Sequence, residues 1–155
     1  MYKKALAIVC GLGVTFGVAN AAVTVNESND ILVSVFVPCA AGGTGEIVDL
    51  SGPLHTLITF TINGNNVSGK QLFHPQGISG VGETTGLKYQ ATGLTQASFK
   101  ISLQNGQANN TFINRFDIIG QGPNNNFSVH ETAHITFNAN GDVTVNFDNF
   151  GIDCN

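Results

Sequence analysis

Three residues in the last part of the chain have types and spacing that could do chemistry together: His130, Glu131 and His134. On a helix, imidazoles four residues apart share one face with their Cβ atoms about 5 to 6 Å apart, so both reach one metal ion. A neighbouring glutamate can then activate a metal-bound water for hydrolysis. On a strand the same spacing spans roughly 13 Å, which is too far for two imidazoles to bind one ion. The local secondary structure therefore decides what these residues can do.

Residues 130–134 resemble the H-E-x-x-H signature of zinc-dependent metalloproteases, and the resemblance extends no further along the chain. The surrounding sequence predicts a strand, because apolar and polar residues alternate strictly over 127–137 and the run ends at the turn signal Asn140-Gly141. We therefore predict no metal site at His130 and His134, no catalytic residue and no cofactor. Zinc-dependent hydrolysis through these histidines is the least favoured alternative.

Glu131 stands where strict alternation turns its side chain to the same face as Val129 and Ala133. A buried carboxylate needs a partner, because an unpaired buried charge is costly. We favour a place at a strand end, at a rim or on a bulge that turns Glu131 outward, since charged residues are rarely buried without a partner. The alternative is a carboxyl group inside the fold, with a raised pKa, that holds a ligand together with Tyr89 and His74.

Apolar residues recur at every second position through most of the chain, which predicts an all-β protein with no helix. Most connections are short and rich in Gly, Asn and Ser, which is typical of an antiparallel meander. Such a meander closes its edges as an up-and-down β-barrel of about eight or nine strands; a two-sheet β-sandwich is the alternative. The predicted strands are 31–37, 45–50, 54–62, 67–73, 87–92, 97–104, 111–119, 127–138 and 143–152, and 74–86 is predicted to be an irregular loop or a ligand lid.

The register of the last hairpin follows from matching apolar side chains across the two strands. A three-residue loop, 139–141, with Gly141 as the left-handed bulge residue, sets Phe137 against Val143. The pairs Ile135 with Val145 and Ala133 with Phe147 then share that apolar face, and Thr136 with Thr144, His134 with Asn146 and Thr132 with Asp148 share a polar face.

The first 21 residues carry the features of a signal peptide: Lys3 and Lys4, an apolar stretch, and an Ala19-Asn20-Ala21 cleavage pattern. We therefore expect one domain over 22–155 that is exported to the periplasm or outside the cell, with no membrane span. Two cysteines remain, Cys39 and Cys154, and an oxidising compartment favours a disulfide between them. Their spacing is unlike the C-x-x-C of redox sites, so we predict a structural bridge.

Charge and composition restrict the partners. Without Lys3 and Lys4, four basic residues face ten acidic ones, and the formal net charge moves from −4 to −6. An acidic protein repels nucleic acid, so we exclude nucleic-acid partners. Two functions remain: a non-catalytic surface or extracellular module that binds a protein or builds a structure, which we favour, and a barrel that carries a small apolar ligand, with residues 74–86 as its lid.

Overall fold

The computed structural model describes residues 22–123 and 125–154. They form nine strands of one antiparallel sheet and a single helical turn, which confirms the all-β prediction. The predicted signal peptide, 1–21, lies outside the described residues. The elements are β1 (Val23–Val37), α1 (Ala40–Gly43), β2 (Glu46–Asn63), β3 (Asn66–Pro75), β4 (Ser79–Gly82), β5 (Lys88–Thr92), β6 (Thr95–Ser102), β7 (Gln107–Gly120), β8 (Phe127–Asn138) and β9 (Val143–Cys154).

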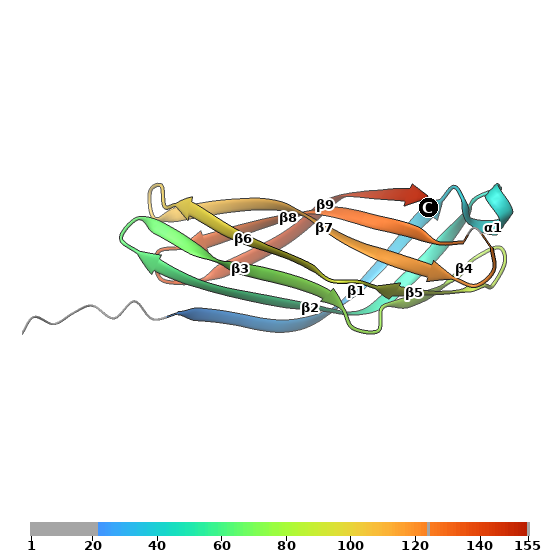
Figure 1. Ribbon diagram of the computed structural model, residues 1–155, viewed down its shortest axis with the longest axis horizontal. Coiled ribbons are helices and arrows are strands. Elements are labelled where there is room, and N and C mark those ends of the chain that lie inside the picture. The colour runs from blue at the N-terminus through green and yellow to red at the C-terminus, as the bar shows by residue number, and fades with distance from the viewer. Residues whose placement is uncertain (1–21, 124, 155) are drawn as a thin grey trace, which may run out of the picture.

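The sheet is rolled into an elongated body of two layers (Figure 1). Its strand order is β6-β3-β2-β4-β5-β7-β8-β9, with β1 paired to the free side of β2. Opposite β1, the long strand β2 has two partners, β4 along its first part and β3 along its second. The start of β6 also reaches β7, where the Thr95 hydroxyl accepts a hydrogen bond from the backbone N–H of Arg115 (3.0 Å). The roll is therefore continuous from β1 round to β9.

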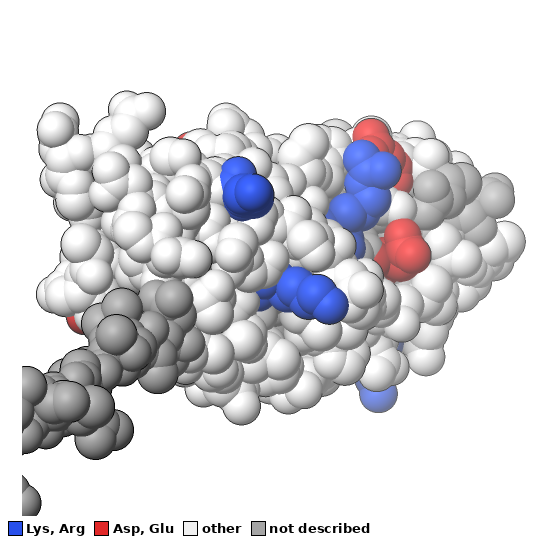
Figure 2. Space-filling view, turned by 60° about the vertical axis from the view of Figure 1, so that its left-hand side comes forward, with Lys and Arg blue, Asp and Glu red and all other residues white. Residues whose placement is uncertain are grey.

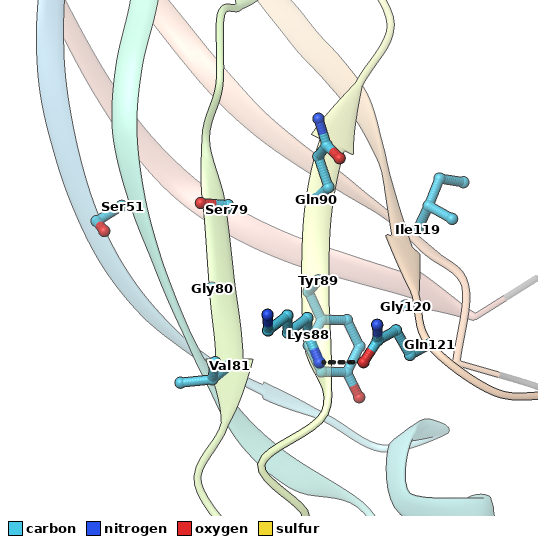
Figure 3. A pocket seen from close by; sticks show the side chains of 10 residues that line it. All are labelled: Ser51, Ser79, Gly80, Val81, Lys88, Tyr89, Gln90, Ile119, Gly120 and Gln121. Atoms are coloured by element: carbon cyan, nitrogen blue, oxygen red, sulfur yellow. Dashed lines mark hydrogen bonds between the residues drawn. The ribbon is translucent and has the colours of Figure 1, made fainter.

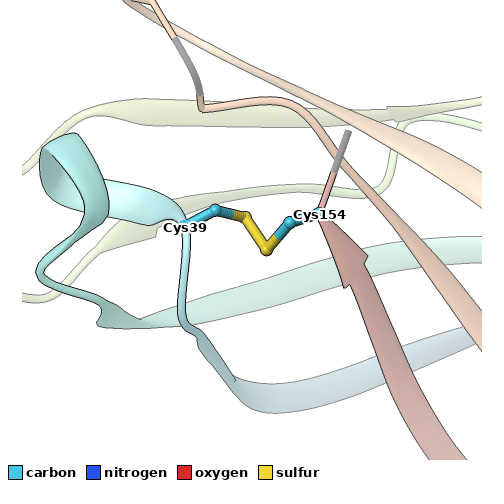
Figure 4. The surroundings of a disulfide bond; sticks show 2 residues. All are labelled: Cys39 and Cys154. Carbon is cyan, nitrogen blue, oxygen red and sulfur yellow. A yellow bond between two sulfur atoms is a disulfide. The ribbon is translucent and has the colours of Figure 1, made fainter.

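The two edge strands, β1 and β9, come together along a seam without forming a ladder among the described residues. At one end of the seam Cys39 and Cys154 form the expected disulfide (Figure 4), with Cα atoms 5.9 Å apart. At the other end Val23 lies beside Gly141. Both strands thus run in the same direction, and a covalent bond fastens the end where they finish.

The structure corrects the predicted break at Ser51-Gly52-Pro53, because β2 runs through these residues without a turn. Pro53 falls where β2 changes its partner from β4 to β3, so its missing N–H interrupts neither ladder. Gly52 is required here, because its φ is +135° and an added Cβ would lie 2.8 Å from the carbonyl oxygen of Gly77. A glycine and a proline therefore mark a change of partner in this strand.

Three further expectations differ from the structure. Residues 74–86 contain the short strand β4, which was predicted to be loop because two of its four residues are glycines. The sequence predicted no helix, yet Ala40–Gly43 make one turn, although Ala41 and Gly42 have positive φ angles of 53° and 70°. The chain is not a simple meander, because β3 pairs with β6 and β2 pairs with β4. The strand β4 and the β3–β6 pairing depend on contacts between segments that are distant in sequence, whereas the helical turn is closed by local hydrogen bonds to Ala40.

The predicted register of the last hairpin is confirmed for all six pairs, from Phe137 with Val143 to Thr132 with Asp148. Beyond it a bulge interrupts the β8–β9 ladder: Asn149 and Phe150 both lie opposite Glu131, and Asn149 has a φ of 51°. The bulge shifts the pairing by one residue before the ladder resumes between His130 and Gly151.

Aromatic rings fill the space between the two layers. Phe137 of β8 contacts Phe60 of β2 and Phe99 of β6, with both centroid distances 5.0 Å. Phe73 of β3 contacts Phe112 of β7 at 5.1 Å. These rings interlock the two layers. In the described part of the chain, no helix is long and apolar enough to cross a membrane.

Candidate functional site

His130 and His134 lie on β8 and face outward, each at the surface between two strands. The Nδ1 atom of His130 is 3.2 Å from Oδ2 of Asp153, and Nε2 of His134 is 3.2 Å from Oδ1 of Asp148. Each histidine therefore has its own aspartate on β9. The strand excludes the helical arrangement that the metalloprotease signature needs. Among residues 22–123 and 125–154, no three His, Cys, Asp or Glu side chains are grouped so as to hold a metal ion.

Glu131 faces the interior, contrary to the favoured expectation of a rim or outward position, and is only 2% exposed. Its partner is Asn114, directly opposite on β7, whose Nδ2 donates a hydrogen bond of 2.7 Å to Glu131 Oε1. Burial raises the pKa of the Glu131 carboxyl group, and the hydrogen bond from Asn114 offsets this only in part. The alternation in the sequence indicated that Glu131 faces the interior. Its partner Asn114 could not be predicted, because the pairing register of β7 with β8 brings the two side chains together.

We expect Glu131→Gln to be more stable than the parent protein at pH 8 and about equally stable at pH 4. A raised carboxyl pKa means that the folded state retains its proton more strongly, so the contribution to stability is present at low pH and is lost as pH rises through the folded pKa. Urea unfolding at both pH values measures this difference. The matched control is Glu27→Gln, which makes the same substitution at an exposed position on β1. A variant that loses stability at pH 8 would show that ionised Glu131 is well compensated.

Tyr89, another predicted ligand residue, is hydrogen-bonded to a second buried carboxylate, that of Glu46. The Tyr89 hydroxyl donates to Glu46 Oε1 at 2.9 Å, and the Thr85 N–H and Oγ1 donate at 3.0 and 2.9 Å. Burial would raise the pKa of Glu46, but these bonds outweigh it and lower the pKa. Burial, together with the bond to Glu46, raises the pKa of Tyr89 to about 12. This arrangement fastens the segment after β4 to the start of β2.

His74, the third predicted ligand residue, lies on β3 directly opposite His55 of β2. Both rings are half-buried, and His55 Nε2 contacts Asn26 Oδ1 of β1 at 2.8 Å. Glu131, Tyr89 and His74 thus have different partners on different strands. The structure does not place them around one ligand site.

A surface hollow of about 680 Å³ opens over β2, β4, β5 and β7 (Figure 3). Its walls are outward side chains such as Ser51, Gln90 and Ile119, and Lys88 is the one charged residue in its lining. Tyr89 contributes its ring, but its hydroxyl points away to Glu46. The lining holds hydroxyl groups without a histidine or carboxylate that could activate them. This hollow is suited to a polar contact and offers no nucleophile and base pair.

Glu46 and Asn114 are the structurally important polar residues that sequence reasoning missed. Glu46 could have been noticed, because it continues the inward alternation of Val48 and Leu50 just as Glu131 continues that of Val129 and Ala133. Asn114 gave a comparable signal, because it stands between Phe112 and Phe116 on the inward face of β7. Its partner Glu131 lies on the neighbouring strand.

Comparisons of this chain with protein-family models, with curated proteins and with solved structures found no match.

Proposed function

We propose that this chain is an exported, non-catalytic β-domain that acts as a structural or binding module outside the cytoplasm. The observation that carries the proposal is an interior filled by interlocked rings, of which Phe60, Phe73 and Phe137 are at most 1% exposed. Such an interior, fastened by a disulfide between Cys39 and Cys154, suits a protein whose task is to persist and present its surface.

The alternative function, carriage of a small apolar ligand, needs an apolar cavity of several hundred Å³ inside the roll. Four hollows, of about 680, 500, 510 and 430 Å³, lie on the described part of the molecule and are lined largely by outward-facing side chains. The predicted ligand residues Glu131 and Tyr89 are bonded to protein partners instead. Both findings favour the module over the carrier.

Native mass spectrometry of the protein purified after export from a bacterial host tests the proposal. We expect each copy, alone or in an assembly, to have the mass of residues 22–155 with one disulfide and no bound small molecule, because aromatic rings fill the interior and the signal peptide is removed. The same sample, analysed for metals, should contain no stoichiometric zinc. A small molecule or zinc ion bound one to one, or a chain retained in the cytoplasm with its leader, would contradict the proposal.

A further inference from the structure

Most exposed acids of the described residues lie apart from the basic side chains, although Glu83 and Asp117 are also exposed and Asp117 lies two residues from Arg115 on β7. Five exposed acids lie on or beside the two edge strands: Glu27 and Asp30 on β1, and Asp142, Asp148 and Asp153 in or next to β9. The four cationic side chains of the described chain lie away from the seam, on β3, β5, β6 and β7: Lys70, Lys88, Lys100 and Arg115. Figure 2 shows basic side chains on one face, with acidic side chains beside some of them and uncharged residues over the rest of the view. Two copies of this protein therefore offer each other complementary surfaces.

On the acidic side, Phe150 forms a projection on β9. It lies in the bulge opposite Glu131, has no cross-strand partner and is 44% exposed. Asn149, in the left-handed conformation that asparagine readily adopts, precedes it. Asp148 and Asp153 flank it, and their side chains remain 54% and 56% exposed although each contacts a histidine. We call Phe150 with these two aspartates the β9 knob.

On the basic side, a hollow of about 500 Å³ opens over β2, β3 and β6. Its apolar part comes from the half-buried Leu57, Leu72 and Ala97. Lys70 lines it, and Lys100 follows two residues after the lining residue Ser98, which is the cross-strand partner of Lys70. We call this the β3 hollow. It combines a site for an apolar side chain with two ammonium groups for flanking carboxylates.

We propose that the β9 knob of one copy docks into the β3 hollow of another, so that the protein associates with itself head to tail. The knob, on β9, and the hollow, over β2, β3 and β6, consist of different residues, so each copy keeps one of them free after the other is used. A contact of this heterologous kind propagates into an open chain or closes into a ring. The inference deepens the proposed function, on which it rests, by naming a second copy as the partner.

Other modes of association fit less well. Direct pairing of β1 or β9 edges between copies would bring acids together, and the bulge in β9 interrupts the row of backbone groups that such pairing needs. Phe36 and Leu32 of β1 are also exposed, at 61% and 80%. However, the Phe36 ring already packs over Gly45 of its own chain, and Leu32 has an acid on one side only on β1, Asp30.

Sedimentation velocity of the exported protein over a range of concentration, at low and high salt, tests the proposal. We expect the parent protein to associate and salt to weaken the association, because the ion pairs at the hollow are exposed and screened. Phe150→Asp and Lys70→Glu should each weaken association about tenfold or more, as loss of a central interface residue does. The matched controls Leu32→Asp and Lys88→Glu, which alter exposed residues outside knob and hollow, should associate like the parent.

Mixing the two defective proteins gives the decisive result. Phe150→Asp retains an intact hollow and Lys70→Glu an intact knob, so a mixture should form one-to-one dimers that grow no further. If Phe150→Asp does not fold by circular dichroism, Phe150→Ser takes its place. A parent protein that stays monomeric, variants that match their controls, or a mixture without dimers would each overturn the proposal. A ligand-free monomer in native mass spectra would overturn this inference alone, whereas a bound ligand or zinc would overturn the proposed function itself.

Discussion

Replacing both cysteines, Cys39→Ser together with Cys154→Ser, should lower the free energy of unfolding by about 4 to 5 kcal/mol, as the chain-entropy model gives for a loop of this size. The bridge joins residues 115 apart in sequence, so it removes many conformations from the unfolded chain. It also fastens two edge strands that have no ladder between them in the described structure. Urea unfolding of the oxidised parent and of the double variant measures the effect.

The parent protein in the presence of a reductant is the control, and it should unfold at the same urea concentration as the double variant. Since domains are commonly stable by only about 5 to 15 kcal/mol, this loss is a large part of the total. A difference below about 1 kcal/mol would contradict the entropic argument, because it would mean that the bridge does not restrict the unfolded chain as the model requires.

Phe137→Ala should cost about 3 to 5 kcal/mol, the range for truncating a buried aromatic side chain. Phe137 is fully buried and contacts rings of both β2 and β6 from its place on β8. Its removal leaves a cavity at the point where the two layers interlock, and the rigid ladders around it cannot collapse to fill it. Thermal and urea unfolding of the variant give the loss.

Phe150→Ala is the matched control for Phe137→Ala, because it removes the same ring from a half-exposed position in the β9 knob. It should change the stability of the monomer by no more than about 0.5 kcal/mol, as surface substitutions usually do. Equal losses from the two variants would refute the view that the aromatic interior, more than aromatic content as such, stabilises the fold.

The two buried glutamates show how the same residue type acquires opposite properties. Glu46 receives hydrogen bonds from a tyrosine, a threonine side chain and backbone N–H groups, and its pKa is lowered. Glu131 has the single amide of Asn114, and its pKa is raised. Sequence alternation indicates that both face inward. It cannot supply their partners, which come from segments at least 17 residues away.

The sequence by itself determined the features that depend on neighbours along the chain. Alternation from 127 to 137 established a strand, and matching its apolar face across Asn140-Gly141 gave the correct hairpin register. The pairing of Cys39 with Cys154 followed because these two are the cysteines that lie outside the predicted leader, 1–21. These features depend on side-chain period, turn residues and residue counts, all of which are local or compositional.

Only the tertiary structure decided the strand order, the passage of β2 through Gly52-Pro53, the strand β4 and the bulge at Phe150. Each results from competition among strands for the same unpaired backbone edges. Which strands pair depends on how the whole sheet twists and packs its aromatic rings. Many different strand orders are compatible with the same two-residue alternation of side chains. Periodicity therefore fixes which way a side chain faces, while the partner it meets is selected by the energy of the assembled fold.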